Sequence, residues 1–363
     1  MKKKILFVDD ETRVLEGLGR MLRNMRSEWE MEFVASGPEA LEALQRDSFH
    51  VLVTDMRMPG MDGYRLLEQA KELHPQVVRI ILSGDSDKEL ILNSVGLAHQ
   101  YLSKPCDPEI LKFTIARVCA QRELLEDGAL IDLMSGIDSL PSMPSLYTEI
   151  VEELGSPRSS VRRVGEIISK DIGMSSKLLQ LVNSSFFGFP AHVSSIFRAV
   201  QLLGLETIKA LILTIKVFSR FDLRSQPPYS SQQLWEHSIA TGVLARSLAT
   251  QEDLEQSKID EAFTAGLLHD LGKLILLEKL PLKCSEIGKI VRSSQCPLWE
   301  AERQVLGTDH AKMGGYLLGI WGISESIIDA VAFHHDPESG SKKAFSTLTA
   351  VYLANSFEDE NAA

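Results

Sequence analysis

Two sets of side chains in this sequence have the types and spacing that phosphorus chemistry and metal binding need. The first set comprises acidic, hydroxyl and ammonium groups, each following a short apolar run: Asp9, Asp10, Asp55, Ser83 and Lys104. Carboxylates held together are costly unless a cation joins them, and Mg²⁺ prefers oxygen ligands. A carboxylate nucleophile, a metal, a hydroxyl and an ammonium group together suit phosphoryl transfer.

The second set is rich in imidazoles. Five of the nine histidines lie from residue 237 onward, each in a segment with helical periodicity: His237, His269, His310, His334 and His335. Asp270 follows His269 directly, which would allow one metal or a bridged pair to be held from a single helical turn. Imidazole nitrogens and a carboxylate that converge from different helices indicate a transition-metal site. A structural metal or a buried polar network is the alternative.

The elements that position the first set alternate between two patterns. Apolar runs at 5–8, 31–35, 51–54, 79–82 and 100–102 are separated by helix-like segments at 14–25, 39–45, 64–73 and 88–95. Such alternation predicts a doubly wound α/β domain with a five-stranded parallel sheet covered on both faces. Ligands bind such sheets at the carboxyl ends of the strands, where the first set is placed.

The remainder of the chain has helical periodicity and predicts an all-α HD-type region. We expect the last helix of residues 1–121 to continue as a connector helix over 122–134. A helical domain then covers 135–356, with one part at 135–220, a break near 222–233, and a second part at 234–356. Residues 357–363 are expected to form a frayed acidic tail.

The composition is that of a globular protein. Of 363 residues, 44% are hydrophobic and 24% charged, and the net charge of −12 disfavours broad binding to nucleic acid or membrane surfaces. The four cysteines form no C-x-x-C pair, so a reduced, cytoplasmic protein is expected. The first apolar run is too short for a signal peptide, and no run is long enough to cross a bilayer. No basic recognition helix for DNA is evident.

The segments FVDDE, TDMRMPGMDG, ILSGDSD and YLSKPCD resemble, in this order, the response-regulator receiver family. The resemblance covers about the first third of the chain. It implies that Asp55 accepts a phosphoryl group from a histidine kinase and that Mg²⁺ is the cofactor. The resemblance also implies that Asp10 binds Mg²⁺ directly, that Asp9 binds it through water, and that the backbone carbonyl of Arg57 is a further ligand. Ser83 and Lys104 would contact the phosphoryl group. The Lys104–Pro105 bond would be cis, and Tyr101 would be the aromatic residue that switches conformation.

The segment HDLGK resembles the HD superfamily of metal-dependent phosphohydrolases. The sequence before it includes LPSMPSLYTEIVEEL and IISKDIGMSSKLLQLVNSSFFG. With these segments, residues 135–355 approximately are similar to the HDOD branch. HDOD domains are regarded mainly as signalling modules, and many have lost metal ligands. In the related HD-GYP branch, the matching residues hold a metal centre that hydrolyses cyclic di-GMP.

This sequence keeps the full histidine set with Asp270, but it departs from the active pattern in two ways. The GYP motif is absent, and Asn355 stands where the superfamily has its final aspartate. A neutral amide is a weaker ligand for Fe, Mn or Zn. Lys273 could contact a phosphate oxygen.

Three outputs therefore remain open. The first is a phosphorylation-controlled signalling protein that acts on an unknown downstream protein, with the connector or a homodimer contact carrying the signal. The second is a receiver-controlled phosphodiesterase for a cyclic dinucleotide or nucleotide. The third is a sensor that binds a nucleotide without turning it over.

Overall fold

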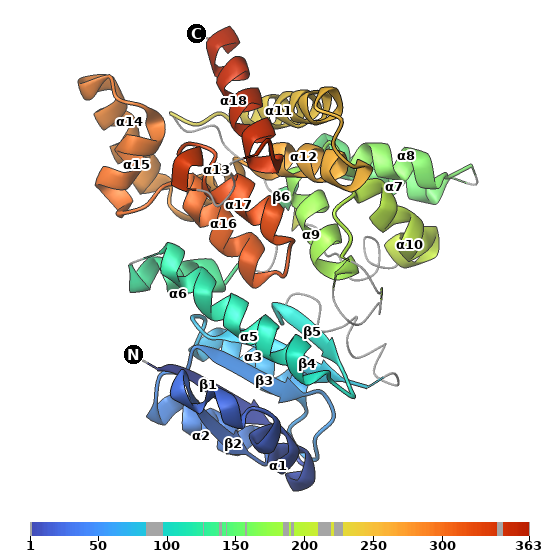
Figure 1. Cartoon of the computed structure of the whole chain (residues 1–363), viewed down its shortest axis with the longest axis vertical. Coiled ribbons are helices and arrows are strands. Elements are labelled where there is room, and N and C mark those ends of the chain that lie inside the picture. Colours follow the sequence, from blue (N-terminus) through green and yellow to red (C-terminus); the bar gives the residue numbers. More distant parts are fainter. Residues whose placement is uncertain are drawn as a thin grey trace.

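In the computed structural model, the chain divides into a sheet-containing part and a helical part, with α5 and α6 between them (Figure 1). The structure describes residues 2–84, 97–125, 127–137, 140–142, 144–156, 158–183, 189, 192–209, 219–220, 228–339 and 344–362. The helix expected over 88–95 lies outside the described residues, as does the first half of the break expected near 222–233, while α11 already begins at Ser231. No helix in these ranges is long and apolar enough to cross a membrane.

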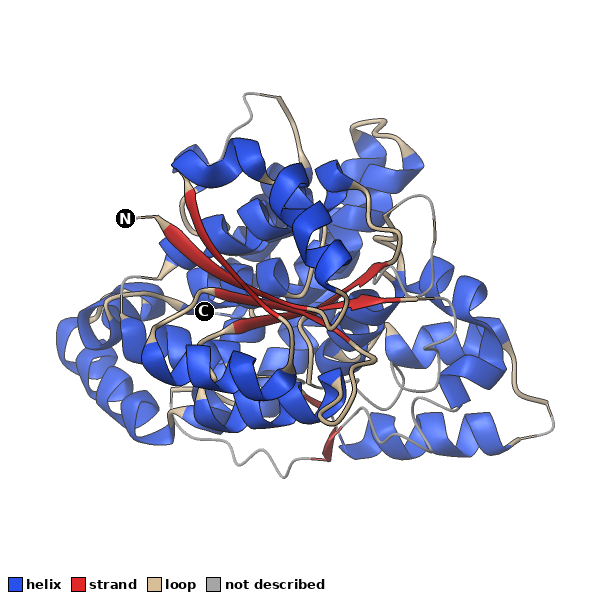
Figure 2. Ribbon diagram, turned by 90° about the horizontal axis from the view of Figure 1, so that it is seen from below, coloured by secondary structure: helices blue, strands red, loops and turns tan. Residues whose placement is uncertain are grey.

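The first part is a parallel five-stranded sheet in the order β2-β1-β3-β4-β5, as the sequence predicts. Helices lie on both sides of it (Figure 2). Its strands are β1 (Lys3–Val8), β2 (Trp29–Val34), β3 (Val51–Asp55), β4 (Val78–Ser83) and β5 (Gln100–Ser103). Its helices are α1 (Thr12–Met21), α2 (Gly37–Arg46), α3 (Gly63–Leu73) and α5 (Pro108–Gln121), with short 3-10 turns η1 (Arg23–Ser27) and η3 (Arg122–Leu124).

Alternation along β1 explains why helices cover both faces. Ile5 and Phe7 belong to the apolar core that also contains residues of α1 and α5, whereas Leu6 and Val8 belong to the core formed with α2 and α3. Successive side chains of a strand point to opposite faces, so a strand that is apolar throughout must be buried on both sides. The parallel register also brings the carboxyl ends of β1, β3 and β4 to one edge of the sheet.

The second part is almost entirely helical. Its first half comprises α6 (Gly128–Ser135), α7 (Pro144–Gly155), α8 (Val161–Ile168), α9 (Ile172–Val182) and α10 (Ile196–Lys209). Its second half comprises α11 (Ser231–Gln251), α12 (Gln256–Leu268), α13 (Leu271–Lys279), α14 (Pro281–Ser294), α15 (Leu298–Leu306), α16 (His310–Ile320), α17 (Glu325–Ala332), η5 (Pro337–Ser339) and α18 (Thr347–Ala362). Two strands of two residues each, β6 (Pro141–Ser142) before α7 and β7 (Ser219–Arg220) after α10, form a parallel pair. The helical pattern of the sequence did not predict this pair.

Two further expectations are wrong. The connector over 122–134 is not a continuation of α5, because the chain becomes extended at the buried Leu125 and a new helix starts at Asp127. The carboxylate of Asp127 accepts hydrogen bonds from the amides of Ala129 and Leu130, which caps that new helix. The acidic end is not frayed from 357, because α18 continues to Ala362.

Candidate functional site

The carboxyl edge of the sheet brings together the acidic groups and Lys104. Asp55 is the last residue of β3, Asp9 follows β1, and Lys104 follows β5. The Lys104 ammonium lies 2.7 Å from Oδ2 of Asp9 and 2.5 Å from Oδ1 of Asp55. One cation therefore holds two carboxylates, as the order of strands predicts.

Burial and charge set the protonation of this site. Burial is the main cause that raises the pKa of Asp55, and the ammonium of Lys104 opposes it. For Lys104, burial lowers the pKa, but the carboxylates of Asp55 and Asp9 outweigh burial and raise it. The lysine therefore stays charged, and Asp55 keeps an oxygen beside a fixed cation, which is the arrangement that a phosphoryl group needs.

The other residues expected at this site lie near it. Ser83 is buried at the end of β4, Asp9 is buried, and Asp10 is exposed. The amide of Arg57 donates a hydrogen bond to Oδ2 of Asp55 at 3.1 Å. Tyr101 is buried on β5. The Lys104–Pro105 bond is cis, as the family resemblance implied.

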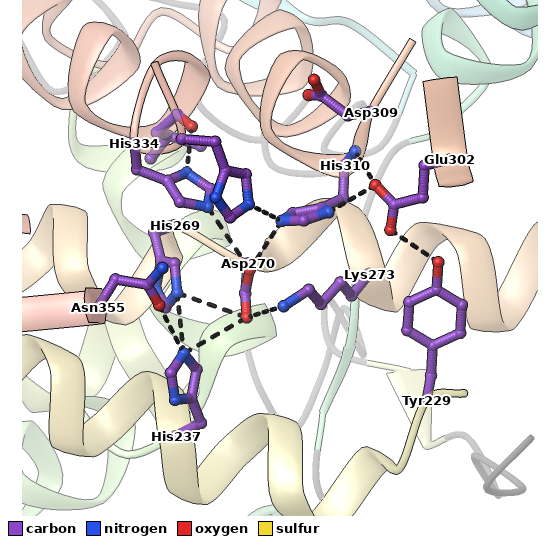
Figure 3. Close-up of polar contacts among 12 residues, drawn as sticks. Tyr229, His237, His269, Asp270, Lys273, Glu302, Asp309, His310, His334 and Asn355 are labelled. Atoms are coloured by element: carbon purple, nitrogen blue, oxygen red, sulfur yellow. Dashed lines mark hydrogen bonds and ion pairs between the residues drawn. The ribbon is translucent and has the colours of Figure 1, made fainter. Parts of the chain in front are cut away.

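The second site lies among the helices of the HD-like half (Figure 3). Three of its residues lie on helices: His237 on α11, His310 at the start of α16 and Asn355 on α18. His269 and Asp270 lie at the junction of α12 and α13. His334 and His335 follow the end of α17. The sequence predicted a single helical turn for His269 and Asp270. The structure instead ends α12 at Leu268, with His269 in the C-cap position, and Asp270 occupies the N-cap position of α13 without a capping hydrogen bond from its side chain.

Asp270 stands at the centre of the second site, and its two oxygens face different histidines. Oδ1 lies 3.1 Å from Nε2 of His310 and 3.9 Å from Nε2 of His334. Oδ2 lies 3.4 Å from Nε2 of His269 and 3.8 Å from Nε2 of His237. The ligand atoms form two clusters, each within 4.8 Å: His237, His269 and Asp270, and His310, His334 and His335. One carboxylate can therefore bridge two cation positions.

Three of the imidazoles are held by their Nδ1 atoms, so that Nε2 faces Asp270. Each Nδ1–H donates to an oxygen: His269 to the Gly266 carbonyl at 2.7 Å, His334 to the Val331 carbonyl at 2.8 Å, and His310 to the Glu302 carboxylate at 2.6 Å. The Nε2 lone pairs are then available as ligands. Metal-bound histidines are typically oriented in this way.

Buried polar atoms without hydrogen-bond partners indicate that a cation could bind between the histidines and Asp270. Nε2 of His334 has no hydrogen-bond partner among the described residues, and Oδ1 of Asp270 makes no hydrogen bond despite His310 nearby. Buried polar atoms without partners are costly. Metal bonds of about 2.0–2.2 Å place neighbouring ligand atoms about 3.0–3.5 Å apart. Because several spacings here are in or near that range, the residues fit a transition metal such as Fe, Mn or Zn.

The protonation states also suit metal binding, which needs neutral imidazoles and an ionised carboxylate. Burial lowers the pKa of His269 to about 4 and that of His335 to about 2. Burial alone would raise the pKa of Asp270, but the positive charges of the neighbouring histidines and Lys273 keep it well below its ordinary value. His310 differs, because Glu302 and Asp270 outweigh burial and raise its pKa to about 9.

Close packing of backbones brings these helices together. A Cβ atom at Gly272 would lie 2.0 Å from the carbonyl oxygen of His310, so α13 can touch the start of α16 only through glycine. Similarly, a Cβ atom at Gly266 on α12 would lie 2.7 Å from Cα of Gly242 on α11. The glycine in HDLGK therefore has a packing role beside the ligand pair.

Two supporting residues were missed by sequence reasoning. The carboxylate of Glu302 is fully buried, accepts from Nδ1 and the amide of His310, and accepts from the hydroxyl of Tyr229 at 2.7 Å. It fixes the orientation of His310. A glutamate within an ordinary amphipathic helix gives no sequence signal for this role, since only tertiary packing brings α15 beside His310.

A cleft of about 490 Å³ opens onto one side of the centre. Its lining includes His237, Asp270 and Lys273, and also Tyr229 and Gln233. Lys273 donates to Oδ2 of Asp270 at 2.6 Å, and Oδ1 of Asn355 lies 2.9 Å from Nε2 of His237. The cleft therefore reaches the centre through the partly exposed His237, whereas His269, His310 and His334 are almost fully buried.

The family comparisons agree with this division. The HDOD domain model matches residues 140–337, more than half of the chain. This chain belongs to the HDOD domain family. The response regulator receiver domain model matches residues 5–116. The first part is thus a receiver domain, and the helical part contains an HDOD domain.

Similar proteins cover only parts of the architecture. An uncharacterized protein of Treponema pallidum is 27% identical over 222 residues, which are 60% of this chain and 42% of the relative. The hydrogenase transcriptional regulatory protein HoxA of Cupriavidus necator is 34% identical over 158 residues, or 43% of this chain and 31% of HoxA. The aligned regions thus span less than half of these relatives.

Among solved structures, the MmoQ response regulator of Methylococcus capsulatus is similar with a TM-score of 0.53 at 24% identity. The match covers 62% of this chain and 88% of that structure. At this level of identity, the likeness concerns the fold.

Proposed function

We propose that this chain is a phosphorylation-controlled signalling protein in which Asp55 accepts a phosphoryl group and the HDOD domain delivers the output. The observation that carries the proposal is the shared ion pairing of Lys104 with Asp9 and Asp55 at the carboxyl edge of the sheet. An Asp55 oxygen would attack phosphorus as the bond to the donor histidine of a kinase breaks. The ammonium of Lys104 would stabilise the charge on the phosphoryl oxygens.

Mg²⁺ at this edge would neutralise further charge on the phosphoryl oxygens. Asp9, Asp10 and the carbonyl of Arg57 are the residues proposed to hold it, and Ser83 is proposed to contact the phosphoryl group. Tyr101 would respond to the modified edge from β5. A histidine kinase as donor and a cytoplasmic location belong to the same proposal.

For the output, binding of a downstream protein is the first candidate, with metal at the histidine centre as a structural or regulatory element. Charge supports this order. Asp270 is the only carboxylate that faces both clusters among the described residues, and the cluster with His237 has the neutral Asn355 in place of a second one. A single shared carboxylate compensates little of the charge of two divalent cations.

A metal-dependent phosphohydrolase acting on a nucleotide or cyclic dinucleotide is the second candidate. The observation that favours it is the cleft that reaches His237, Asp270 and Lys273. A bound metal would supply an activated water. Lys273 would hold a phosphate oxygen, and Asp270 would orient the metal ligands around it.

Phosphorylation with a small-molecule phosphodonor tests the main proposal. The full chain with Mg²⁺ should gain one phosphoryl mass by intact-protein mass spectrometry, and Asp55→Asn should gain none. Asp132→Asn, on the exposed side of α6, serves as the matched control and should behave like the unaltered chain. Equal labelling of the Asp55→Asn variant would overturn the proposal.

A further inference from the structure

The receiver and the HDOD domain share a buried polar contact at one end of α16. The side-chain amide of Gln100, the first residue of β5, donates to the carbonyl oxygen of Ile320 at 3.0 Å. Gln100 is only 8% exposed. Ile320 is the last residue of α16, so the receiver holds the carboxyl end of that helix.

The other end of α16 is part of the candidate metal centre. His310 is the first residue of the helix, and Asp309 caps it by accepting from the amide of Lys312. The helix has 11 residues, which corresponds to a rod of about 16 Å. A single rigid element therefore contacts the receiver at one end and carries a candidate ligand at the other.

On the receiver side, a single short strand separates Gln100 from the phosphoacceptor site. Strand β5 has only four residues, Gln100–Ser103, and Lys104 follows it directly. Because Lys104 pairs with Asp9 and Asp55, a phosphoryl group on Asp55 must redistribute the ion pairs of Lys104. Gln100 lies at the opposite end of the same strand.

Further contacts hold α16 in place along its length. The hydroxyls of Tyr316 and Ser135 are 2.7 Å apart, and the Ser135 carbonyl accepts from Nε2 of His99 at 2.8 Å. At Gly319, a Cβ atom would lie 2.3 Å from Cγ of Gln121. The helix packs so closely on the receiver that it cannot shift without changing these contacts.

We propose that α16 couples the two sites, so that occupation of the phosphoacceptor site changes the metal affinity of the histidine centre. This inference rests on the proposed function, since it needs both a phosphoryl-accepting Asp55 and a metal-binding centre. Because coupling between binding equilibria is reciprocal, metal at His310 and its neighbours must change the affinity of the receiver for a reversible phosphoryl mimic by the same factor. The route crosses the domain interface from β5 to α16, and α16 also packs against the connector segments η3 and α6.

Affinity measurements on the full chain test the coupling. Mn²⁺ binding is titrated in saturating Mg²⁺, with and without beryllium fluoride as the phosphoryl mimic, and Mn²⁺ bound by a His269→Ala variant is subtracted. We expect beryllium fluoride to change the Mn²⁺ affinity by at least about 5-fold, and Mn²⁺ to change the beryllium fluoride affinity equally. Gln100→Ala should reduce the factor to within about 2-fold while both ligands still bind.

Gln180→Ala is the matched control. Gln180 is also a buried interdomain glutamine, but it lies on α9 and donates to the carbonyl of His99. This variant should retain the full coupling. Gly319→Ala tests the contact from the side of the helix and should also weaken coupling, whereas Gly17→Ala, with open space around it, should not.

The outcomes separate the inference from the proposed function. Absence of beryllium fluoride binding in the unaltered chain would overturn the phosphoacceptor proposal, and absence of Mn²⁺ binding would overturn the proposed metal centre; either result would overturn the inference. Independent binding of both ligands would overturn the inference alone. Equal loss of coupling in Gln100→Ala and Gln180→Ala would show that domain docking, and not α16, transmits the effect.

Discussion

The phosphoacceptor site and the histidine centre both pair a lysine with a buried carboxylate, but only the histidine centre adds neutral nitrogen ligands. In the receiver, Lys104 lies between Asp9 and Asp55. In the histidine centre, Lys273 pairs with Asp270, burial keeps His269 and His334 neutral, and Nε2 of His334 has no partner among the described residues. The receiver carboxylates thus have an internal cation as their partner, whereas the histidine centre also holds neutral ligand atoms that an added cation would satisfy.

The difference teaches how each site can be switched. A site with a built-in cation responds when a covalent group competes for that cation. A site that also holds neutral ligand atoms would respond to the availability of metal. Under the proposed function, one chain would sense two chemically unrelated inputs, and the following substitutions would break or sharpen this contrast.

The largest effect is expected from Asp270→Asn. Loss of the shared carboxylate removes the only negative charge that faces both histidine clusters in the described part of the chain, so metal affinity should fall by at least about 100-fold. Elemental mass spectrometry of protein purified without chelator measures the metal content. Retention of stoichiometric metal in this variant would show that Asp270 is not a ligand.

Glu302→Gln should have the next largest effect. The variant keeps the shape of the side chain but weakens its hold on His310, so metal affinity should fall by about 10- to 100-fold. Glu286→Gln changes an exposed glutamate on α14 and should leave the affinity unchanged. If Glu302→Gln binds metal as tightly as the control, the buried glutamate is only a packing residue.

Lys104→Met tests the receiver side of the contrast. Two carboxylates lose their shared cation, so the free energy of unfolding should fall by roughly 1–3 kcal/mol without Mg²⁺. Added Mg²⁺ should restore part of the loss. The more exposed pair of Lys283 and Glu286 provides the control, and Lys283→Met should cost less than about 1 kcal/mol. Chemical denaturation monitored by circular dichroism measures both, and equal losses would contradict the contrast.

The smallest effect concerns pH and the domain contact. Burial holds the pKa of His99 well below its ordinary value, so the folded protein keeps this imidazole neutral. The unfolded chain takes up the proton as pH falls through about 6.5, so stability contributed by neutral His99 is present above that pH and lost below it. His99→Gln should therefore flatten the fall of the unfolding temperature between about pH 7 and 5. His74→Gln, which alters a more exposed histidine, should flatten it less.

The fold of the receiver could be predicted from the sequence, because each expected functional group lies at the end of its own strand or just after it. Strand ends at Asp55 and Lys104 need only local patterns and the parallel order of the sheet. The histidine centre was predicted less completely. Its ligand types were readable, but Glu302 and Tyr229 reach it only through tertiary packing of α15 and the segment before α11.

The connector shows how a correct pattern led to a wrong element. Apolar periodicity continues beyond Gln121, so a single helix was predicted. The signal that ends it is Asp127, a good N-cap residue followed by Gly128. Helical periodicity describes which faces are apolar, and it does not show whether one helix or two present them.

The short parallel pair β6–β7 gives the HDOD domain a modular boundary. It brings residues 141–142 beside residues 219–220, so the chain leaves and re-enters the domain at nearly the same point. Every candidate metal ligand, from His237 to Asn355, comes after that point. Helices α7 to α10 lie within this closed excursion and share one apolar core with the ligand-bearing helices. The pair therefore fixes both ends of a helical layer that supports the centre from behind without supplying a ligand to it.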